Sequence, residues 1–335
     1  MHAVRKITLI SLLIGCGYAW GGFYEGFEQY DQGNYELALQ EFRPLAEEGN
    51  AFAQLYLGVM YEQGHGVPQD DKEAVKWWRM AAEQGSAVAQ FNLAGMYARG
   101  EGVQRDDSEA VKWYRAAARA GLADAQFSLG GQYAEGLGID QNLKVAAYWY
   151  RKAAEQGDAR AQLSLGILYD EGRGVARDYT AAANWYSLAA EQGDPRAQYN
   201  LGGLYASGQG VTKDYVQAAN WYRRAADQGD ALAQYNLGIL FDAGQGVPQD
   251  DEQAVQWYRR AAEQGIADAQ YNLAIMYHEG MGVPQDDVEA YKWFSIVAAG
   301  GSNEALSGRN AIARTMTATQ IAEAQRRARE WRRKP

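Results

Sequence analysis

Few residues in this 335-residue chain are suited to covalent chemistry. There is one cysteine, Cys16, and there are three scattered histidines, His2, His65 and His278. A nucleophilic site needs a base beside its nucleophile, and a zinc site needs several converging ligands, so these residues nominate neither. Paired acids such as Asp70 and Asp71 precede an amphipathic run, where a carboxylate caps a helix. The sequence therefore assigns no catalytic residue, no metal site and no cofactor.

Residues suited to noncovalent recognition are more plentiful. Tyrosine and asparagine recur side by side at a spacing of 36 residues, as Tyr199, Tyr235, Tyr271, Asn200, Asn236 and Asn272. Tyrosine buries a large area, and an asparagine amide both donates to and accepts from a peptide backbone. With Arg160 and Arg196 three residues before the tyrosine column, they form the predicted binding site for a partner protein. The alternative is that the tyrosines pack between the equivalent first helices of successive repeats and the asparagines hydrogen-bond across the repeat interface.

A 36-residue repeat must position these side chains. It is marked by one glutamine in each copy: Gln54, Gln90, Gln126, Gln162, Gln198, Gln234 and Gln270. Seven copies follow one another without insertion over residues 50–301. Self-similarity at a fixed period of this size is typical of a solenoid, in which each unit packs on its neighbours.

Each copy predicts two helices joined by a glycine-rich loop. In the first copy, small and apolar residues at helical spacing indicate helix A over about 51–62, and Gly64 ends it. The pattern Asp70-x-x-Glu73 then predicts a capping box at the start of helix B, which ends at Gly85. Small residues let the helix axes approach closely, and the tryptophans and tyrosines are predicted to be mostly core.

The segments on either side extend the array. Residues 20–49 predict a shortened first hairpin of the tetratricopeptide type. Residues 302–335 predict capping helices, whose apolar side carries Ile321, Ala324, Ala328 and Trp331.

The repeated pattern A-x-A-Q-x-x-L-G-x-x-Y-x-x-G-x-G-V resembles the Sel1-like repeat, a subfamily of the tetratricopeptide superfamily. The departures are minor, such as Ala94 and Ala274 in place of glycine. The resemblance implies an all-α, right-handed superhelical solenoid whose helices A line a concave groove, and whose usual work is to hold other proteins in assemblies. Some Sel1-type relatives are cysteine-rich proteins credited with binding or hydrolysing β-lactams. Their paired cysteines are absent here, which argues against that enzymatic alternative.

Charge narrows the choice of partner. The formal net charge is −10, with +2 in residues 1–15 and +5 in residues 302–335, so residues 16–301 carry about −17. An acidic body without a basic stripe argues against nucleic acid. It suits a soluble monomer that repels its own copies.

The first 19 residues predict a secretory signal. Arg5 and Lys6 precede a short apolar run, which is too short to span a bilayer. The stretch 13–16 resembles a bacterial lipobox, in which Cys16 would carry a lipid and attach the protein to a membrane. The rival interpretation is ordinary cleavage after Ala19. Both predict a periplasmic, outer-membrane-attached or secreted protein.

The sequence thus predicts an exported, non-enzymatic interaction scaffold or adaptor that binds proteins of the bacterial cell envelope in its groove. A structural component of a polysaccharide-export or secretion assembly is the alternative, and the residues do not separate it from a signalling role.

Overall fold

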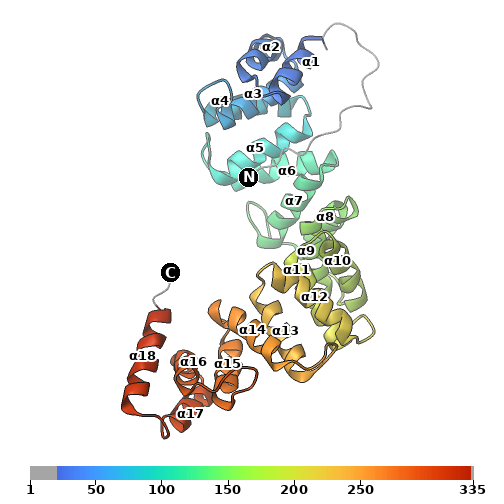
Figure 1. Ribbon diagram of the computed structural model, residues 1–335. Helices are drawn as coiled ribbons and strands as arrows, with labels where there is room; N and C mark the ends of the chain where they lie inside the picture. Colours follow the sequence, from blue (N-terminus) through green and yellow to red (C-terminus); the bar gives the residue numbers. More distant parts are fainter. Residues whose placement is uncertain (1–20, 333–335) are drawn as a thin grey trace. The chain divides into compact units, whose positions relative to one another are not determined.

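The computed structural model describes residues 21–332, and all regular secondary structure in that range is α-helix (Figure 1). The helices are α1 (Gly21–Asp31), α2 (Tyr35–Glu47), α3 (Ala51–Gln63), α4 (Asp71–Glu83), α5 (Ala87–Arg99), α6 (Asp107–Arg119), α7 (Ala123–Glu135), α8 (Leu143–Glu155), α9 (Ala159–Glu171), α10 (Tyr179–Glu191), α11 (Pro195–Ser207), α12 (Tyr215–Asp227), α13 (Ala231–Ala243), α14 (Asp251–Glu263), α15 (Ala267–Glu279), α16 (Asp287–Ala299), α17 (Asn303–Ile312) and α18 (Ala318–Arg332). The predicted all-α class is confirmed.

The chain forms two compact units, one holding α1 to α8 and the other α9 to α18. Within each unit, every odd-numbered helix up to α15 packs against the helix that follows it, as a helical hairpin (Figure 1). We call the first helix of each hairpin helix A and the second helix B. Each helix B then packs on helix A of the next hairpin in the same unit, so that the hairpins stack in chain order. This is the solenoid packing that the repeat predicts.

The loop residues set the helix ends much as predicted. Gly64 ends α3 in the left-handed conformation, with φ of 70°. The Asp70 side chain caps α4 by accepting hydrogen bonds from the backbone N–H groups of Lys72 and Glu73. The second half of the predicted capping box is wrong, because the Asp70 N–H donates to the Tyr61 carbonyl at 2.9 Å instead of to Glu73.

Glycines in helix A admit large rings from helix B. In the second unit, a Cβ added to Gly166 would lie 2.6 Å from the ring of Tyr186, and one on Gly238 would lie 2.7 Å from the ring of Tyr258. Both rings are 1% exposed. The predicted packing role of these small residues is confirmed, because any larger side chain would push the two helices apart.

The repeated glutamines bond successive hairpins together. Gln198 on α11 donates through Nε2 to the carbonyl of Ala190 on α10 at 3.1 Å. Its Oε1 accepts from Nε2 of Gln228, the residue that caps α12, at 2.8 Å. One buried amide therefore joins three helices. The sequence reveals the glutamine column but not these bonds.

The C-terminal helix covers the last repeat. Ala324 and Ala328 of α18 are buried, and the Trp331 ring lies 5.7 Å from that of Trp293 on α16, at a steep angle. Arg327 pairs with Glu289 of α16 at 2.7 Å. The side of α18 predicted to be apolar is thus the side that packs.

Candidate functional site

The tyrosines of the predicted site lie on three helices A of the second unit: Tyr199 on α11, Tyr235 on α13 and Tyr271 on α15. All three are half-buried. Each ring packs against an aromatic ring of its own helix B, with centroid distances of 5.9 Å for Tyr199–Tyr222, 5.9 Å for Tyr235–Tyr258 and 5.5 Å for Tyr271–Phe294. The packing holds each ring in place and leaves part of it open to solvent. Each tyrosine therefore has a packing contact, with helix B of its own hairpin, and an exposed part that a partner could contact.

Two of the predicted asparagines form bonds between side chains inside the array. Asn200 hydrogen-bonds to the hydroxyl of Tyr186 on the preceding helix B. Asn272 does the same to Tyr258, and it also bonds the hydroxyl of Tyr235. Asn236 is half-buried, and its side chain makes no hydrogen bond within residues 21–332. Asn200 and Asn272 thus bond across the repeat interface, as the alternative interpretation of the asparagines predicts. The Asn236 amide remains available to a partner.

The tyrosine hydroxyls around these amides are held in the protonated form. Burial, and then the Asp242 carboxylate, raise the pKa of Tyr258, whose hydroxyl donates to Asp242 Oδ2 at 3.2 Å. Burial, and then Asp268, raise the pKa of Tyr235, while its bond to Asn272 opposes the rise. At neutral pH this cluster consequently presents neutral hydrogen-bond donors beside carboxylates.

The predicted arginines lie at the start of their helices. Arg160 is in the first turn of α9 and Arg196 is in the first turn of α11, and both are exposed. The Arg196 guanidinium forms no ion pair with any residue that the structure describes. It therefore contributes an uncompensated positive charge one turn before Tyr199.

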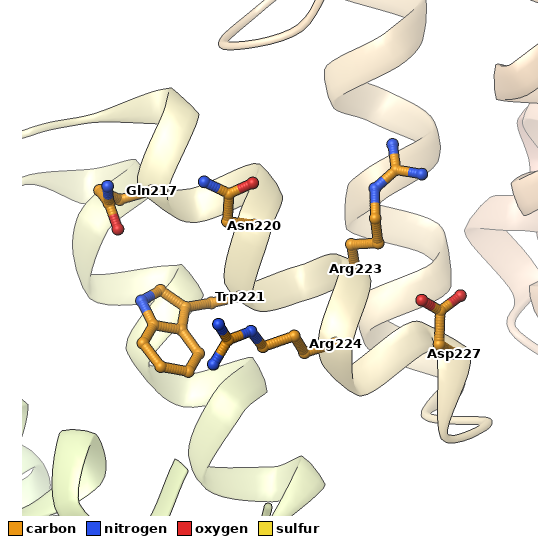
Figure 2. A pocket seen from close by; sticks show the side chains of 6 residues that line it. All are labelled: Gln217, Asn220, Trp221, Arg223, Arg224 and Asp227. Carbon is orange, nitrogen blue, oxygen red and sulfur yellow. The ribbon is translucent and has the colours of Figure 1, made fainter. Parts of the chain in front are cut away.

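Helix B of the fifth repeat carries a separate surface hollow of about 390 Å³. Figure 2 shows that the side chains lining it all project from α12, with Arg224 beside Trp221. The guanidinium carbon lies 4.6 Å from the indole centroid, which is cation–π distance. This arginine covers the ring face that a planar ligand would need, so the hollow is a weaker candidate than the tyrosine columns.

The described histidines have structural neighbours. Nδ1 of His65 lies 3.3 Å from the Tyr30 hydroxyl, and Nδ1 of His278 lies 2.7 Å from Asp287 Oδ1. Among residues 21–332, no three His, Cys, Asp or Glu side chains converge as a metal site would require. Cys16 and the predicted signal at 1–19 lie outside the described residues. None of the described helices is both long and apolar enough to cross a bilayer.

Comparisons with known proteins agree with this architecture. The model of the Sel1 repeat family matches seven consecutive segments, at residues 51–86, 87–122, 123–158, 159–194, 195–230, 231–266 and 267–302. A solved Sel1 repeat protein from Oxalobacter formigenes is 38% identical, with a TM-score of 0.65 over 86% of this chain and 85% of its own. A solved protective antigen of uropathogenic Escherichia coli with an SLR fold is 30% identical, with a TM-score of 0.60 over 94% and 92%.

One curated relative has a named role. An exopolysaccharide production negative regulator from Rhizobium leguminosarum bv. viciae is 43% identical over 54 residues, which are 16% of this chain and 20% of that protein. The match thus spans only a fifth of that relative. Stacked hairpins of this kind present many side chains along one surface and are suited to protein–protein interaction. The seven family matches, together with the likeness to these solved proteins, show that this chain belongs to the Sel1 repeat family.

Proposed function

We propose that this protein is an exported, non-enzymatic scaffold of the bacterial cell envelope, which binds segments of partner proteins on the helix-A face of its second unit. The helix-A face is the surface that carries Arg160, Arg196, Tyr199, Asn200, Tyr235, Asn236, Tyr271 and Asn272. The observation that carries the proposal is the row of three tyrosines at equivalent positions of consecutive repeats, each half-buried and each held by a ring of helix B.

Rings fixed in this way favour binding. A partner gains contact area with an aromatic side chain without having to immobilise it, so that less entropy is lost on association. The Asn236 amide supplies a donor and an acceptor for a peptide backbone beside Tyr235. Repeats one and four lack the ring altogether, because Leu55 and Leu163 occupy the tyrosine position, and repeats two and three lack the hydroxyl, because Phe91 and Phe127 stand there. The columns are therefore free to differ without loss of the repeat, as a binding surface requires.

The test replaces Tyr199, Tyr235 and Tyr271 together by leucine. Leucine suits this position, since Leu55 is 9% exposed and Leu163 is 6% exposed in the same place. Partners crosslinked to the full-length protein in intact cells are identified by mass spectrometry, and we expect the triple variant to lose them.

The matched control is Leu188→Ala with Val216→Ala, on helices B of the same unit, where these side chains are 45% and 53% exposed. This control should retain the partners. Equal recovery with the leucine variant, at an unchanged circular-dichroism spectrum, would remove the binding face from the proposal.

Export and lipid attachment are the second part of the proposal. They are supported by the pattern of residues 1–19 and by the position of the single cysteine in the lipobox-like stretch. Cys16→Ser, or inhibition of lipoprotein signal cleavage, should shift the electrophoretic mobility of the protein and release it from the membrane fraction. Unchanged mobility and unchanged fractionation would remove the anchor and leave cleavage after Ala19 as the route.

The role of the scaffold can be regulatory or structural. The short match to an exopolysaccharide regulator supports the first role only through 54 residues. A structural place in a polysaccharide-export or secretion assembly is the alternative. The two are separated by the crosslinked partner: an enzyme or signalling protein indicates regulation, and a stable assembly subunit indicates a structural role.

A further inference from the structure

Three equivalent tyrosines of the second unit differ in what their hydroxyls contact. Tyr186, Tyr222 and Tyr258 occupy the same position on successive helices B and are 1%, 5% and 1% exposed. The hydroxyl of Tyr186 donates to Asp170 at 3.1 Å, and that of Tyr258 donates to Asp242 at 3.2 Å. In both repeats a helix-A carboxylate thus satisfies the buried hydroxyl.

Tyr222 has no such acceptor. Ala206 stands where its two neighbours have aspartate, and the Tyr222 hydroxyl makes no hydrogen bond within residues 21–332. Burial raises the pKa of Tyr222, so the hydroxyl stays a donor at neutral pH. The hydroxyl oxygen of Tyr222 is not fully enclosed by protein, so solvent can reach it. A buried ring therefore presents an unused donor at the surface.

A glycine opens the space in front of this hydroxyl. The neighbouring repeats have Ile167 and Ile239 where the fifth repeat has Gly203. A Cβ on Gly203 would meet only the Tyr222 hydroxyl, at 3.7 Å, which is an ordinary contact. Gly203 lies inside α11 without a positive φ, so neither the backbone nor the packing requires glycine there. Since glycine is a poor helix former, its presence at this point calls for another explanation.

The charges around the Tyr222 hydroxyl indicate which kind of group could bind beside it. After burial, Asp170 and Glu171 raise the pKa of Tyr186 and Asp242 raises that of Tyr258, whereas Tyr199 follows burial as the cause that raises the pKa of Tyr222. Arg196 begins the same face of α11 seven residues earlier, about 10 Å along the helix axis from Gly203. An unused donor that no helix-A carboxylate occupies, on the same helix face as the unpaired Arg196, is complementary to a negatively charged oxygen.

We propose that Gly203, Ala206 and Tyr222 form a notch that receives a carboxylate side chain from the protein segment bound on the helix-A face. The Tyr222 hydroxyl donates to the carboxylate, and Arg196 attracts the acidic segment. The proposal rests on the proposed function and specifies it further: the partner segment is acidic where it crosses the fifth repeat.

Two repeats of the first unit also have glycine at the position of Gly203, but each differs from the fifth repeat in one respect that would hinder a carboxylate. In the third repeat, Gly131 faces Tyr150 in the same way, but Glu135 acts on that tyrosine and would repel a carboxylate. In the second repeat, Nη1 of Arg99 lies 2.9 Å from the Cβ position of Gly95 and fills the space. The fifth repeat alone, among the described repeats, combines the glycine, an unfilled space beside it, the unused hydroxyl, and no carboxylate among the groups that raise the pKa of its tyrosine.

The test uses a displayed library of random peptides, selected on the full-length protein. The notch variant is Gly203→Ile with Ala206→Asp, which copies repeats four and six and should fold as they do. Tyr222→Phe is the second variant. We expect the selected peptides to carry Asp or Glu, and replacement of that residue by Asn or Gln to weaken binding at least tenfold. Both variants should bind at least tenfold more weakly than the native chain.

Each other outcome is decisive. Peptides that bind the notch variant as tightly as the native chain, yet are lost with leucine at Tyr199, Tyr235 and Tyr271, would overturn the notch and keep the binding face. Peptides that also bind the leucine variant at full affinity would overturn both. A library that yields no peptide above the level of the leucine variant would count against both as well.

Discussion

Ala120→Gln should stabilise the first unit, because it completes a hydrogen bond that the second repeat lacks. Each repeat carries one buried glutamine on helix A. Where that glutamine has a side-chain partner, the donor is a second glutamine at the C-terminal end of helix B. In the first repeat, Gln84 Nε2 donates to Gln54 Oε1 at 2.8 Å. Position 120 is alanine, and Oε1 of Gln90 is accordingly buried without a partner. The backbone is already suitable: Ala120 has φ −73° and ψ −1°, close to the −83° and 2° of Gln84.

The expected gain follows from two opposing quantities. A buried acceptor without a partner costs roughly 1–3 kcal/mol, which the new bond removes. Ordering a glutamine side chain costs up to about 1.5–2 kcal/mol. The net gain should be about 1 kcal/mol, which corresponds to a rise in Tm of roughly 2–4 °C for a unit of this size.

Urea unfolding followed by circular dichroism measures this gain. Ala120→Glu is the matched control, because the ionised side chain has a similar length but no donor, so it should bring no gain. Gln156→Ala is the reverse test, since it removes the 2.7 Å bond to Gln126 in the next repeat and should cost about 1 kcal/mol. The reasoning fails if glutamine and glutamate at position 120 stabilise equally, or if neither change at 120 or 156 alters the midpoint.

Three further predictions concern the tyrosines and the proposal that the protein is not an enzyme. Tyr186→Phe should cost about 1–2 kcal/mol by leaving Asp170 without its donor, whereas Tyr222→Phe should change stability by under about 0.5 kcal/mol. Equal losses in urea unfolding would contradict the difference between the two repeats. Burial raises the pKa of Tyr150 to about 12, above the value near 10 expected in the unfolded chain. The resulting stabilisation is complete below pH 10 and is lost as the pH rises toward 12, so Tm should fall above pH 10. A flat Tm between pH 7 and about 11 would refute this. Purified protein should not turn over nitrocefin, and hydrolysis that scales with protein concentration would revive the enzymatic alternative.

The spacing of residues was enough to predict the repeat. Glycine, aspartate and small residues act locally, so Gly64 and Asp70 mark helix ends without any knowledge of tertiary contacts. The reciprocal capping bond at Glu73 was predicted wrongly, because the competing acceptor, the Tyr61 carbonyl, lies nine residues earlier and is close only in the folded loop.

The candidate site depends on contacts that a helical wheel does not contain. A helical wheel predicts the side of the helix on which Tyr235 lies. It does not predict that the Tyr235 ring packs against the ring of Tyr258. It also cannot say that Asn272 reaches across to the preceding hairpin. One signal was present in the sequence: the columns at Gly203 and Ala206 change together, from Ile and Asp in the adjacent repeats. Its meaning requires the hydroxyl of Tyr222, which lies 3.7 Å from the Cβ position of Gly203 in the fold.

The most direct test of the binding face is photocrosslinking from single positions in living cells. Benzoylphenylalanine replaces Tyr235 on the helix-A face or, as the control, Gln256, which is exposed on α14. The side chain at 235 should crosslink a distinct protein of the cell envelope, and the side chain at 256 should not. Crosslinks from 256 but none from 235 would contradict the helix-A face as the site of partner binding.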